Sequence, residues 1–391
     1  MDLYQQNHPK YFWRFTDEIP DAIWQRAILQ AKLCLGVANE TTEMDDMLQL
    51  VLGEGQFGHD HWQLSPLKRL YYNLKPIFPR FLIRIMRQVY QPISSSGFPM
   101  GWPIEDRYVL FLWEIARQIL TMTGRSSLEF TPFWPDENHF AFVITHDIET
   151  WQGQKFIRQV ADLEESLGFR SSFNFVPERY SIDQSLIDEL KVRGFEIGIH
   201  GLKHDGKLFS SKNEFYRRAK LINQYLKTYG AVGFRAPLTH RHPEWMQVLE
   251  IEYDLSFFDT DPYEPIPGGT MSIWPFFLGH FVELPYTLVQ DNTLISVLGE
   301  TTPKIWLEKI DFIEKYFGMA LVNSHPDYLI QNLNWNVYKE FLISIKNRQG
   351  YWQALPREVA HWWRNRTNYG LSMSTASLRN GELMIDVNTP I

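Results

Sequence analysis

The sequence of 391 residues contains a single cysteine, Cys34, so no internal disulfide framework can form. Leu33 and Leu35 flank it, and a buried structural thiol is expected there rather than a reactive one. The chain also lacks an excess of positive charge, because 38 Lys and Arg face 46 Asp and Glu, a formal net charge of −8. This balance argues against a general nucleic-acid-binding protein, whose surface is usually basic.

Two kinds of segment that direct a chain to or through a membrane are also missing. Residues 1–8 do not combine a basic stretch with a following apolar one, as a signal peptide does. No run of about 18 uncharged apolar residues occurs, so we expect no transmembrane helix. These absences favour the cytoplasm as the compartment.

The chain has ample apolar material for a large core. Hydrophobic residues make up 44% of it, with 14 Trp, 18 Tyr and 27 Phe. Its length suits one large α/β domain with additions, or two domains. The patterns divide it into a helical N-terminal region (1–130), a region of alternating strands and helices (131–365) and a polar C-terminal tail (366–391). The tail has at most a short strand at 382–387.

Apolar residues recur at helical spacing in four segments of the N-terminal region: 21–35, 42–52, 67–90 and 106–122. Between the second and third of these, Gly53, Gly55 and Gly58 match the spacing of a dinucleotide-binding fingerprint. That fingerprint follows a strand, whereas a helical pattern precedes these glycines. We therefore interpret the segment as a loop.

The segment 67–90 is basic throughout and contains no acidic residue. Its cations are Lys68, Arg69, Lys75, Arg80, Arg84 and Arg87. Basic residues interleaved with apolar ones are typical of a helix that lies on an anionic membrane or holds a polyanionic substrate. Helices packed on the rest of the protein, with their cations in water, explain the pattern more simply. Peripheral membrane contact through this segment is the alternative.

From about residue 138 the pattern changes to strands followed by helices. Strands are expected at 140–145, 171–176, 195–199, 232–234, 253–258, 282–284 and 319–323. Helices are expected at 151–167, 183–193, 211–229, 243–250 and 303–317. Regular alternation with short links implies a parallel sheet, and this number of units favours closure into a barrel. Polar motifs follow directly after the strands, where such barrels carry their active sites.

Two of these motifs suggest a metal site. His200 and His204 are four residues apart, a spacing that puts two imidazoles on one face of a helical turn. Asp147 and Glu149 leave the first strand two residues apart. Glu149, His200 and His204 would hold a divalent ion, most simply zinc, with open positions for water and a substrate oxygen. Asp147 is then free to act as general base. The alternative is that the two histidines only begin a capped helix.

Further polar residues follow the later strands. Arg235 is expected to hold Asp147 by a bidentate pair, and His325 to act as general acid. Three carboxylates are candidates to hydrogen-bond His325 or to bind substrate hydroxyls: Asp259, Asp261 and Glu283. Four aromatic residues could stack on sugar rings, although core packing explains them equally well: Tyr263, Trp274, Phe276 and Phe277.

Taken together, these motifs resemble those of the polysaccharide deacetylase family. Thr145–Glu149 is similar to its first motif, His200–His204 to its metal-binding motif, Phe234–Pro237 to its arginine motif and His325 to its final histidine. The resemblance covers roughly residues 138–330. It implies an incomplete (β/α)7-type barrel, a divalent metal that is usually zinc, and hydrolysis of an N-acetyl or O-acetyl group.

Two positions depart from the family pattern. Ile148 separates Asp147 from Glu149, where the family usually has adjacent aspartates, so the division between base and metal ligand stays open. Gly201 replaces the Ser or Thr that often follows the first metal histidine.

The function expected from these residues is removal of an acetyl group from an N-acetylated or O-acetylated sugar. Without a signal peptide, a cytoplasmic glycan precursor is a more natural substrate than finished wall polymer. Two alternatives remain: hydrolysis of a non-sugar amide such as a cyclic ureide, and non-catalytic glycan binding on the same barrel. The sequence predicts no particular oligomeric state.

Overall fold

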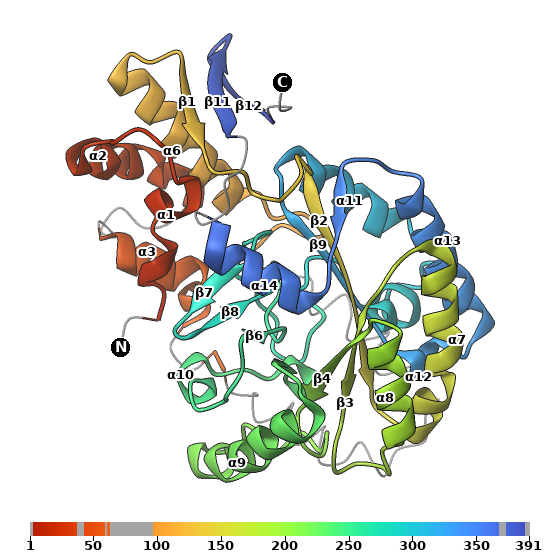
Figure 1. The fold of residues 1–391 in the computed structure, drawn as a ribbon. Coiled ribbons are helices and arrows are strands. Elements are labelled where there is room, and N and C mark those ends of the chain that lie inside the picture. Colours follow the sequence, from red (N-terminus) through yellow and green to blue (C-terminus); the bar gives the residue numbers. More distant parts are fainter. Residues whose placement is uncertain (1–2, 37–42, 59–60, 63–96, 367–372, 388–391) are drawn as a thin grey trace.

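A computed structural model describes residues 3–36, 43–58, 61–62, 97–366 and 373–387 (Figure 1). The basic segment 67–90, with its expected membrane contact, lies outside the described residues. None of the helices in the described ranges is both long enough and apolar enough to cross a membrane.

Seven parallel strands form the central sheet. They are β2 (Phe140–Ile148), β3 (Ser172–Phe175), β4 (Glu196–His200), β5 (Gly233–Arg235), β6 (Tyr253–Asp254), β8 (Phe281–Glu283) and β9 (Met319–Ser324). Each pairs with the next from β2 to β8, and β9 pairs with the other side of β2. Between β8 and β9 there is no continuous ladder among the described strands. A single parallel bridge, Leu288 to Val322, joins the segment after β8 to β9, and another, Phe258 to Tyr286, joins the segments after β6 and β8. The expected incomplete (β/α) barrel is therefore confirmed.

Strand β2 shows why these segments form the centre of the barrel. All nine of its residues are buried, and its apolar run Phe140–Ile144 is typical of a parallel strand covered on both faces. Two short strands extend the sheet: β10 (Tyr351–Gln353), parallel to β2, and β7 (Phe276–Leu278), antiparallel to β8.

Helices pack around the barrel as the sequence predicts (Figure 1). They are α7 (Trp151–Leu167), α8 (Gln184–Val192), α9 (Lys212–Tyr229), α10 (Pro243–Met246) and α11 (Lys304–Lys315). Thr150, Asp183 and Ser211 cap the first three by accepting hydrogen bonds from backbone N–H groups. Helix α10 is shorter than expected. Three later helices were not predicted: α12 (Pro326–Leu329), α13 (Asn332–Lys346) and α14 (Pro356–Asn365).

The N-terminal part of the described chain is mainly helical, as expected. It contains η1 (Gln5–Asn7), α1 (Pro9–Trp13), α2 (Asp21–Ala31), η2 (Lys32–Leu35), α3 (Met44–Val51), η3 (Gly55–Phe57) and α6 (Arg107–Thr123). A three-stranded antiparallel sheet joins it to the C-terminus: β1 (Ser127–Phe130), β11 (Ser374–Arg379) and β12 (Glu382–Asp386). Strand β12 matches the expected short strand, whereas β11 was not foreseen. The division of the chain at about residues 130 and 365 stays a prediction.

The glycine-rich segment 53–58 attaches the N-terminal region to the barrel. Glu54 is 1% exposed, and its carboxylate accepts hydrogen bonds from Arg241 at 2.6 and 2.8 Å and from the Gly269 N–H at 2.6 Å. Burial would raise the pKa of Glu54, but Arg241 and His61 lower it to about 2. The loop interpretation is confirmed, because η3 is a single turn that follows a helix.

Two of the aromatic residues near β7 belong to the core. Trp274 is 1% exposed, lies 4.9 Å from the Phe12 ring and stacks on Trp113 at 5.6 Å, and its Nε1–H donates to the carbonyl of Phe317. Phe276 is also buried. Core packing therefore explains Trp274 and Phe276, whereas Tyr263 and Phe277 are half-buried and their stacking on a sugar stays a prediction.

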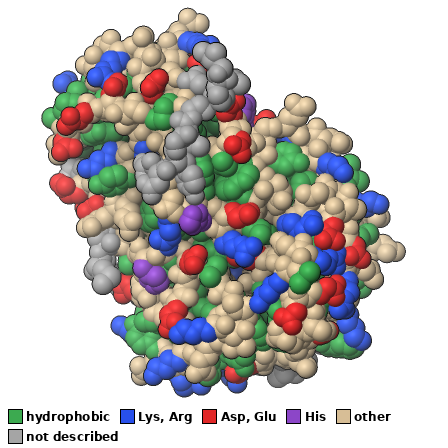
Figure 2. Space-filling view, viewed as in Figure 1, with side chains coloured by type: hydrophobic (Ala, Val, Ile, Leu, Met, Phe, Trp, Pro, Cys, Tyr) green, Lys and Arg blue, Asp and Glu red, His purple; other side chains and the backbone are tan. Residues whose placement is uncertain are grey.

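Charged side chains of both signs are interspersed over the face drawn in Figure 2. Several charged side chains form ion pairs between neighbouring helices. Arg193, after α8, contacts Asp162 at 2.6 Å and Glu165 at 2.7 Å, both on α7. Such exposed pairs contribute little stability each.

A buried carboxylate ties α14 to one end of the barrel. Glu196 begins β4, is 3% exposed, and accepts hydrogen bonds from the Tyr253 hydroxyl at 2.9 Å and the Arg357 N–H at 3.1 Å. Arg357 lies in the first turn of α14, which packs against β2, β6 and β8. Burial raises the pKa of Glu196 from 4.5 to about 7.

This raised pKa predicts a pH-dependent loss of stability that Glu196→Gln removes. The folded state binds the proton more tightly than the unfolded state, so the contribution to stability is complete below pH 4.5 and is lost as the pH rises through 7. Glutamine keeps one acceptor for Arg357 and one donor for the Tyr253 oxygen. We expect the variant to gain up to about 3 kcal/mol over the wild type between pH 5 and pH 8. Urea unfolding of both proteins at pH 5 and at pH 8, with a chelator present to remove any metal, measures the free energy of unfolding. An equal difference between variant and wild type at the two pH values would contradict the prediction.

Candidate active site

The polar motifs lie at one end of the barrel. Asp147 is near the end of β2 and Glu149 follows it, His200 ends β4, Arg235 ends β5, and His325 follows β9. Because parallel strands end at the same edge of a sheet, residues far apart in sequence meet there.

Three side chains meet as a possible metal site. One ligand atom from each of Glu149, His200 and His204 lies within 4.8 Å of the others. Nε2 of His204 is 3.0 Å from a carboxylate oxygen of Glu149, and the two imidazole centroids are 5.0 Å apart. The structure thus brings together the three residues that the sequence suggested as ligands.

The conformation of the histidine loop differs from the expected helical turn. His200 is the last residue of β4, and residues 201–210 form no helix. Gly201 and His204 both have left-handed backbones, with φ of +64° and +51°. A Cβ at position 201 would lie 2.3 Å from the Pro237 ring, so only glycine fits. This explains the departure from the Ser or Thr of the family motif and excludes a capped helix start.

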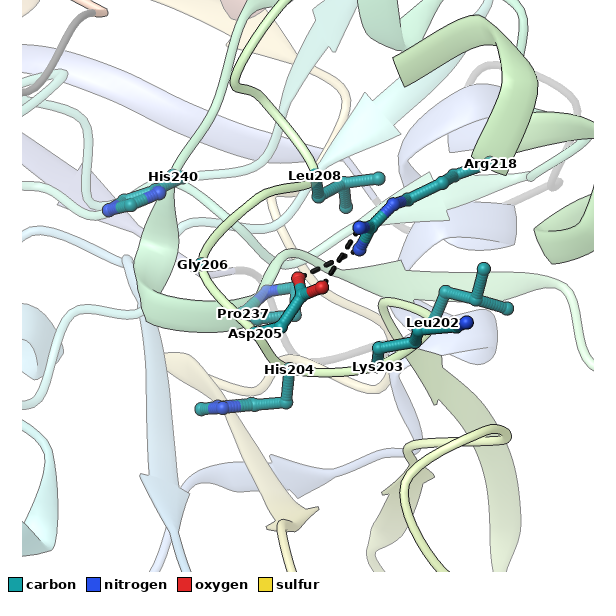
Figure 3. Close-up of a pocket in the computed structure, with 9 residues that line it drawn as sticks. All are labelled: Leu202, Lys203, His204, Asp205, Gly206, Leu208, Arg218, Pro237 and His240. Carbon is teal, nitrogen blue, oxygen red and sulfur yellow. Dashed lines mark hydrogen bonds and ion pairs between the residues drawn. The ribbon is translucent and has the colours of Figure 1, made fainter. Parts of the chain in front are cut away.

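An ion pair anchors the loop behind His204. Asp205 forms a bidentate pair with Arg218 of α9, with both distances at 2.8 Å (Figure 3). The His204 side chain points away from this pair.

The three side chains have the chemistry that a divalent metal requires. Nδ1 of His200 lies 3.2 Å from the Arg235 carbonyl oxygen, which can only accept, so the Nε2 lone pair is left for an ion. Burial lowers the pKa of His200 to about 4, which keeps its ring neutral at pH 7. Burial would raise the pKa of Glu149, but His204 lowers it well below its ordinary value. Nε2 of His204 is buried and has no hydrogen-bond partner among the described residues, although the Glu149 oxygen is close. Two ligands of one tetrahedral ion lie about 3.3 Å apart, close to the separation seen here.

Asp147 lies beside this cluster as an ionised carboxylate. It is 2% exposed and accepts hydrogen bonds from Asn174 at 3.0 Å, Asn323 at 2.9 Å and Arg235 at 3.3 Å. Burial would raise its pKa, but His200 and Arg235 hold it well below the ordinary value. Nδ1 of His200 is 3.8 Å away.

The contact with Arg235 is not the expected bidentate pair. One guanidinium nitrogen of Arg235, Nη1, donates to Asp147, while Nε donates to the Leu255 carbonyl at 2.9 Å. Asn174 and Asn323 supply the other two hydrogen bonds to Asp147. Sequence reasoning missed both asparagines, although an amide within an apolar strand is a detectable signal.

His325 faces Asp147 and is held by Asp291. Nδ1 of His325 lies 2.7 Å from Asp291, which also accepts the His325 backbone N–H at 2.9 Å. Nε2 lies 4.0 Å from Asp147. Burial would lower the pKa of His325, but Asp291 raises it to about 10, so the ring carries both protons at pH 7. Asp291 caps the short helix η6 (Asn292–Val297), and the sequence did not reveal its role.

None of the three carboxylates suggested as partners of His325 contacts it in the described part of the chain. Glu283, Asp259 and Asp261 are each at most 1% exposed. Glu283 accepts the Phe257 N–H at 3.1 Å and lies beside Asp254; burial and Asp254 raise its pKa well above the ordinary value. Asp259 pairs with Lys309 at 2.5 Å, and Asp261 accepts the Tyr263 N–H at 2.7 Å. They lie in the barrel interior and in the loop after β6. The predicted hydrogen bond to His325 is therefore wrong, because Asp291 makes it, whereas the binding of substrate hydroxyls stays a prediction.

No family model and no curated protein matches the chain. Solved structures resemble its barrel. A putative polysaccharide deacetylase from Mycobacterium smegmatis has a TM-score of 0.48 at 16% identity and covers 60% of this chain and 93% of its own. A probable polysaccharide deacetylase from Pseudomonas aeruginosa has a TM-score of 0.49 at 14% identity, covering 60% and 94%. PuuE allantoinase has a TM-score of 0.49 at 13% identity, covering 61% and 95%. At these identities and TM-scores the likeness concerns the arrangement of the barrel alone.

Proposed function

We propose that this protein is a zinc-dependent hydrolase that removes an acetyl group from an N-acetylated or O-acetylated sugar. One observation carries the proposal: Glu149, His200 and His204 converge to within 4.8 Å, with Asp147 and His325 beside them and 4.0 Å apart. Two neutral imidazoles and one carboxylate are the protein ligands of many catalytic zinc sites. When bound, such an ion lowers the pKa of a water molecule and polarises an acyl carbonyl.

Asp147 serves as the general base. Its carboxylate is ionised and accepts three hydrogen bonds, which leave it fixed beside the ligand cluster. It takes the proton of the attacking water. Arg235, which is 1% exposed, stabilises the negative charge of Asp147 from within the barrel.

His325 serves as the general acid. Asp291 fixes Nδ1 and the backbone, so Nε2 is directed toward the reacting atoms. The protonated ring donates from Nε2 to the departing amine or hydroxyl. A poor leaving group such as an amine needs this proton, which suits hydrolysis of an amide.

The access to the site suits a small acyl group. The side chains of Glu149, His204 and His325 are 20%, 8% and 6% exposed, so only their edges reach solvent. The sugar part of the substrate is inferred from the resemblance of the four motifs to those of the polysaccharide deacetylases.

Metal analysis of the purified protein, combined with acetate release from acetylated sugars, tests this function. The panel contains N-acetylglucosamine oligomers, nucleotide-linked N-acetyl sugars, O-acetylated sugars and a cyclic ureide. Zinc-dependent acetate release supports the proposal. Ring opening of the ureide without acetate release replaces it with the amidase alternative. Zinc binding with no hydrolysis of any compound favours the non-catalytic glycan-binding alternative.

A further inference from the structure

Asp327 connects the two loops that carry the opposite sides of the site. It lies two residues after His325, in the first turn of α12. One of its carboxylate oxygens accepts the backbone N–H of Glu149 at 3.0 Å. The other accepts the hydroxyl of Thr150, the residue that caps α7. The segment that carries His325 is thus hydrogen-bonded directly to the segment that carries Glu149.

The contact is too close for any side chain at position 153. Gly153 lies in the first turn of α7, and a Cβ there would be 2.2 Å from one Asp327 oxygen and 2.5 Å from its carboxyl carbon. Glycine is a poor helix former, and it is found here where the carboxylate packs against the helix. This explains a glycine within the amphipathic pattern of α7.

We propose that Asp327 is a positioning residue that sets the Glu149 carboxylate for metal binding, and that Gly153 is required to admit it. The inference rests on the proposed function, since it assumes that Glu149 is a ligand. Glu149 has no secondary structure to hold it, because β2 ends at Ile148 and α7 begins at Trp151. The Tyr180 hydroxyl donates to the Ile148 carbonyl at 2.6 Å, and Asp327 accepts from the N–H of Glu149. Partners that orient metal ligands in this way tune metal affinity.

Asp327→Ala tests the proposal through the zinc dissociation constant, measured by competition with a chromogenic chelator. Loss of an outer-shell partner is expected to weaken zinc binding by about 10- to 100-fold. Asp327→Asn is expected to stay close to the wild type, because its oxygen accepts the Glu149 N–H and its amide donates to Thr150. Asp311→Ala is the matched control, since Asp311 is 66% exposed and, within the described part of the chain, its side chain pairs only with Arg348.

Gly153→Ala provides a second test that does not remove a charge. Alanine forms helices more readily than glycine, so α7 itself should tolerate the change, and the overlap falls on the Asp327 carboxylate alone. We expect weaker zinc binding, because the new methyl group displaces Asp327. In the Asp327→Ala background the same change is expected to have no further effect on zinc affinity, so the two changes couple in a double-mutant cycle.

The outcomes separate this inference from the proposed function. If His204→Ala loses zinc while Asp327→Ala and Gly153→Ala bind it like the wild type, the positioning role is wrong and the metal site stands. If His204→Ala retains zinc, the proposed function itself fails. Should Asp327→Ala not fold, as judged by circular dichroism, Gly153→Ala decides alone. Additive rather than coupled effects in the cycle also overturn the inference.

Discussion

His204→Ala is expected to abolish both zinc content and acetate release. The wild type should carry about one zinc ion per chain, as three protein ligands allow. The variant leaves Glu149 and His200 as the only ligands of the cluster. Alanine must also adopt the left-handed backbone that His204 has, with φ of +51°. Atomic absorption after dialysis against a weak chelator measures the zinc, and acetate release measures activity on the same samples.

His361→Ala is the matched control for this change. His361 lies on α14, is exposed, and contacts only Asn365 among the hydrogen bonds seen in the described residues. It should retain full zinc and full activity. His200→Ala should match His204→Ala, because both rings contribute to one ion. Full zinc in both site variants would show that the ion binds elsewhere.

The fold could be predicted from the sequence largely because its signals are local. Buried parallel strands such as Phe140–Ile144 are continuous apolar runs, and helices such as α9 carry a capping residue and a terminal glycine. The short strand β11 has no such signal. It forms because β1, nearly 250 positions earlier in the chain, offers an edge to pair with, and no local pattern encodes that partner.

The candidate site was predicted only as far as residue types and strand ends allow. The positions after β2, β4, β5 and β9 follow from the barrel topology. The hydrogen-bond partners of these residues do not follow from it, because they depend on how side chains from different strands and loops point toward one another. Asp291 holds His325 from a segment 34 residues earlier, while the more conspicuous Asp259 is occupied by Lys309. The histidine loop was misjudged because a packing contact, Gly201 against Pro237, fixes its backbone.

Asp147→Asn is expected to keep zinc and lose turnover by about 10³-fold, within the range for removal of a general base. The amide has nearly the same shape as the carboxylate, but it cannot take a proton from water. Zinc content and circular dichroism establish that the site is intact, and kcat for acetate release gives the effect.

Glu149→Gln, measured beside Asp147→Asn, decides how the two carboxylates divide their roles. Glu149 lies 3.0 Å from His204, whereas Asp147 receives three hydrogen bonds from neutral or cationic donors. A metal ligand needs a free lone pair directed at the ion, and Asp147 has most of its acceptor positions already occupied. We therefore expect Glu149→Gln to lose zinc and Asp147→Asn to keep it. The reverse pattern would make Asp147 the ligand and Glu149 the base, with His200 and His204 unchanged in their roles.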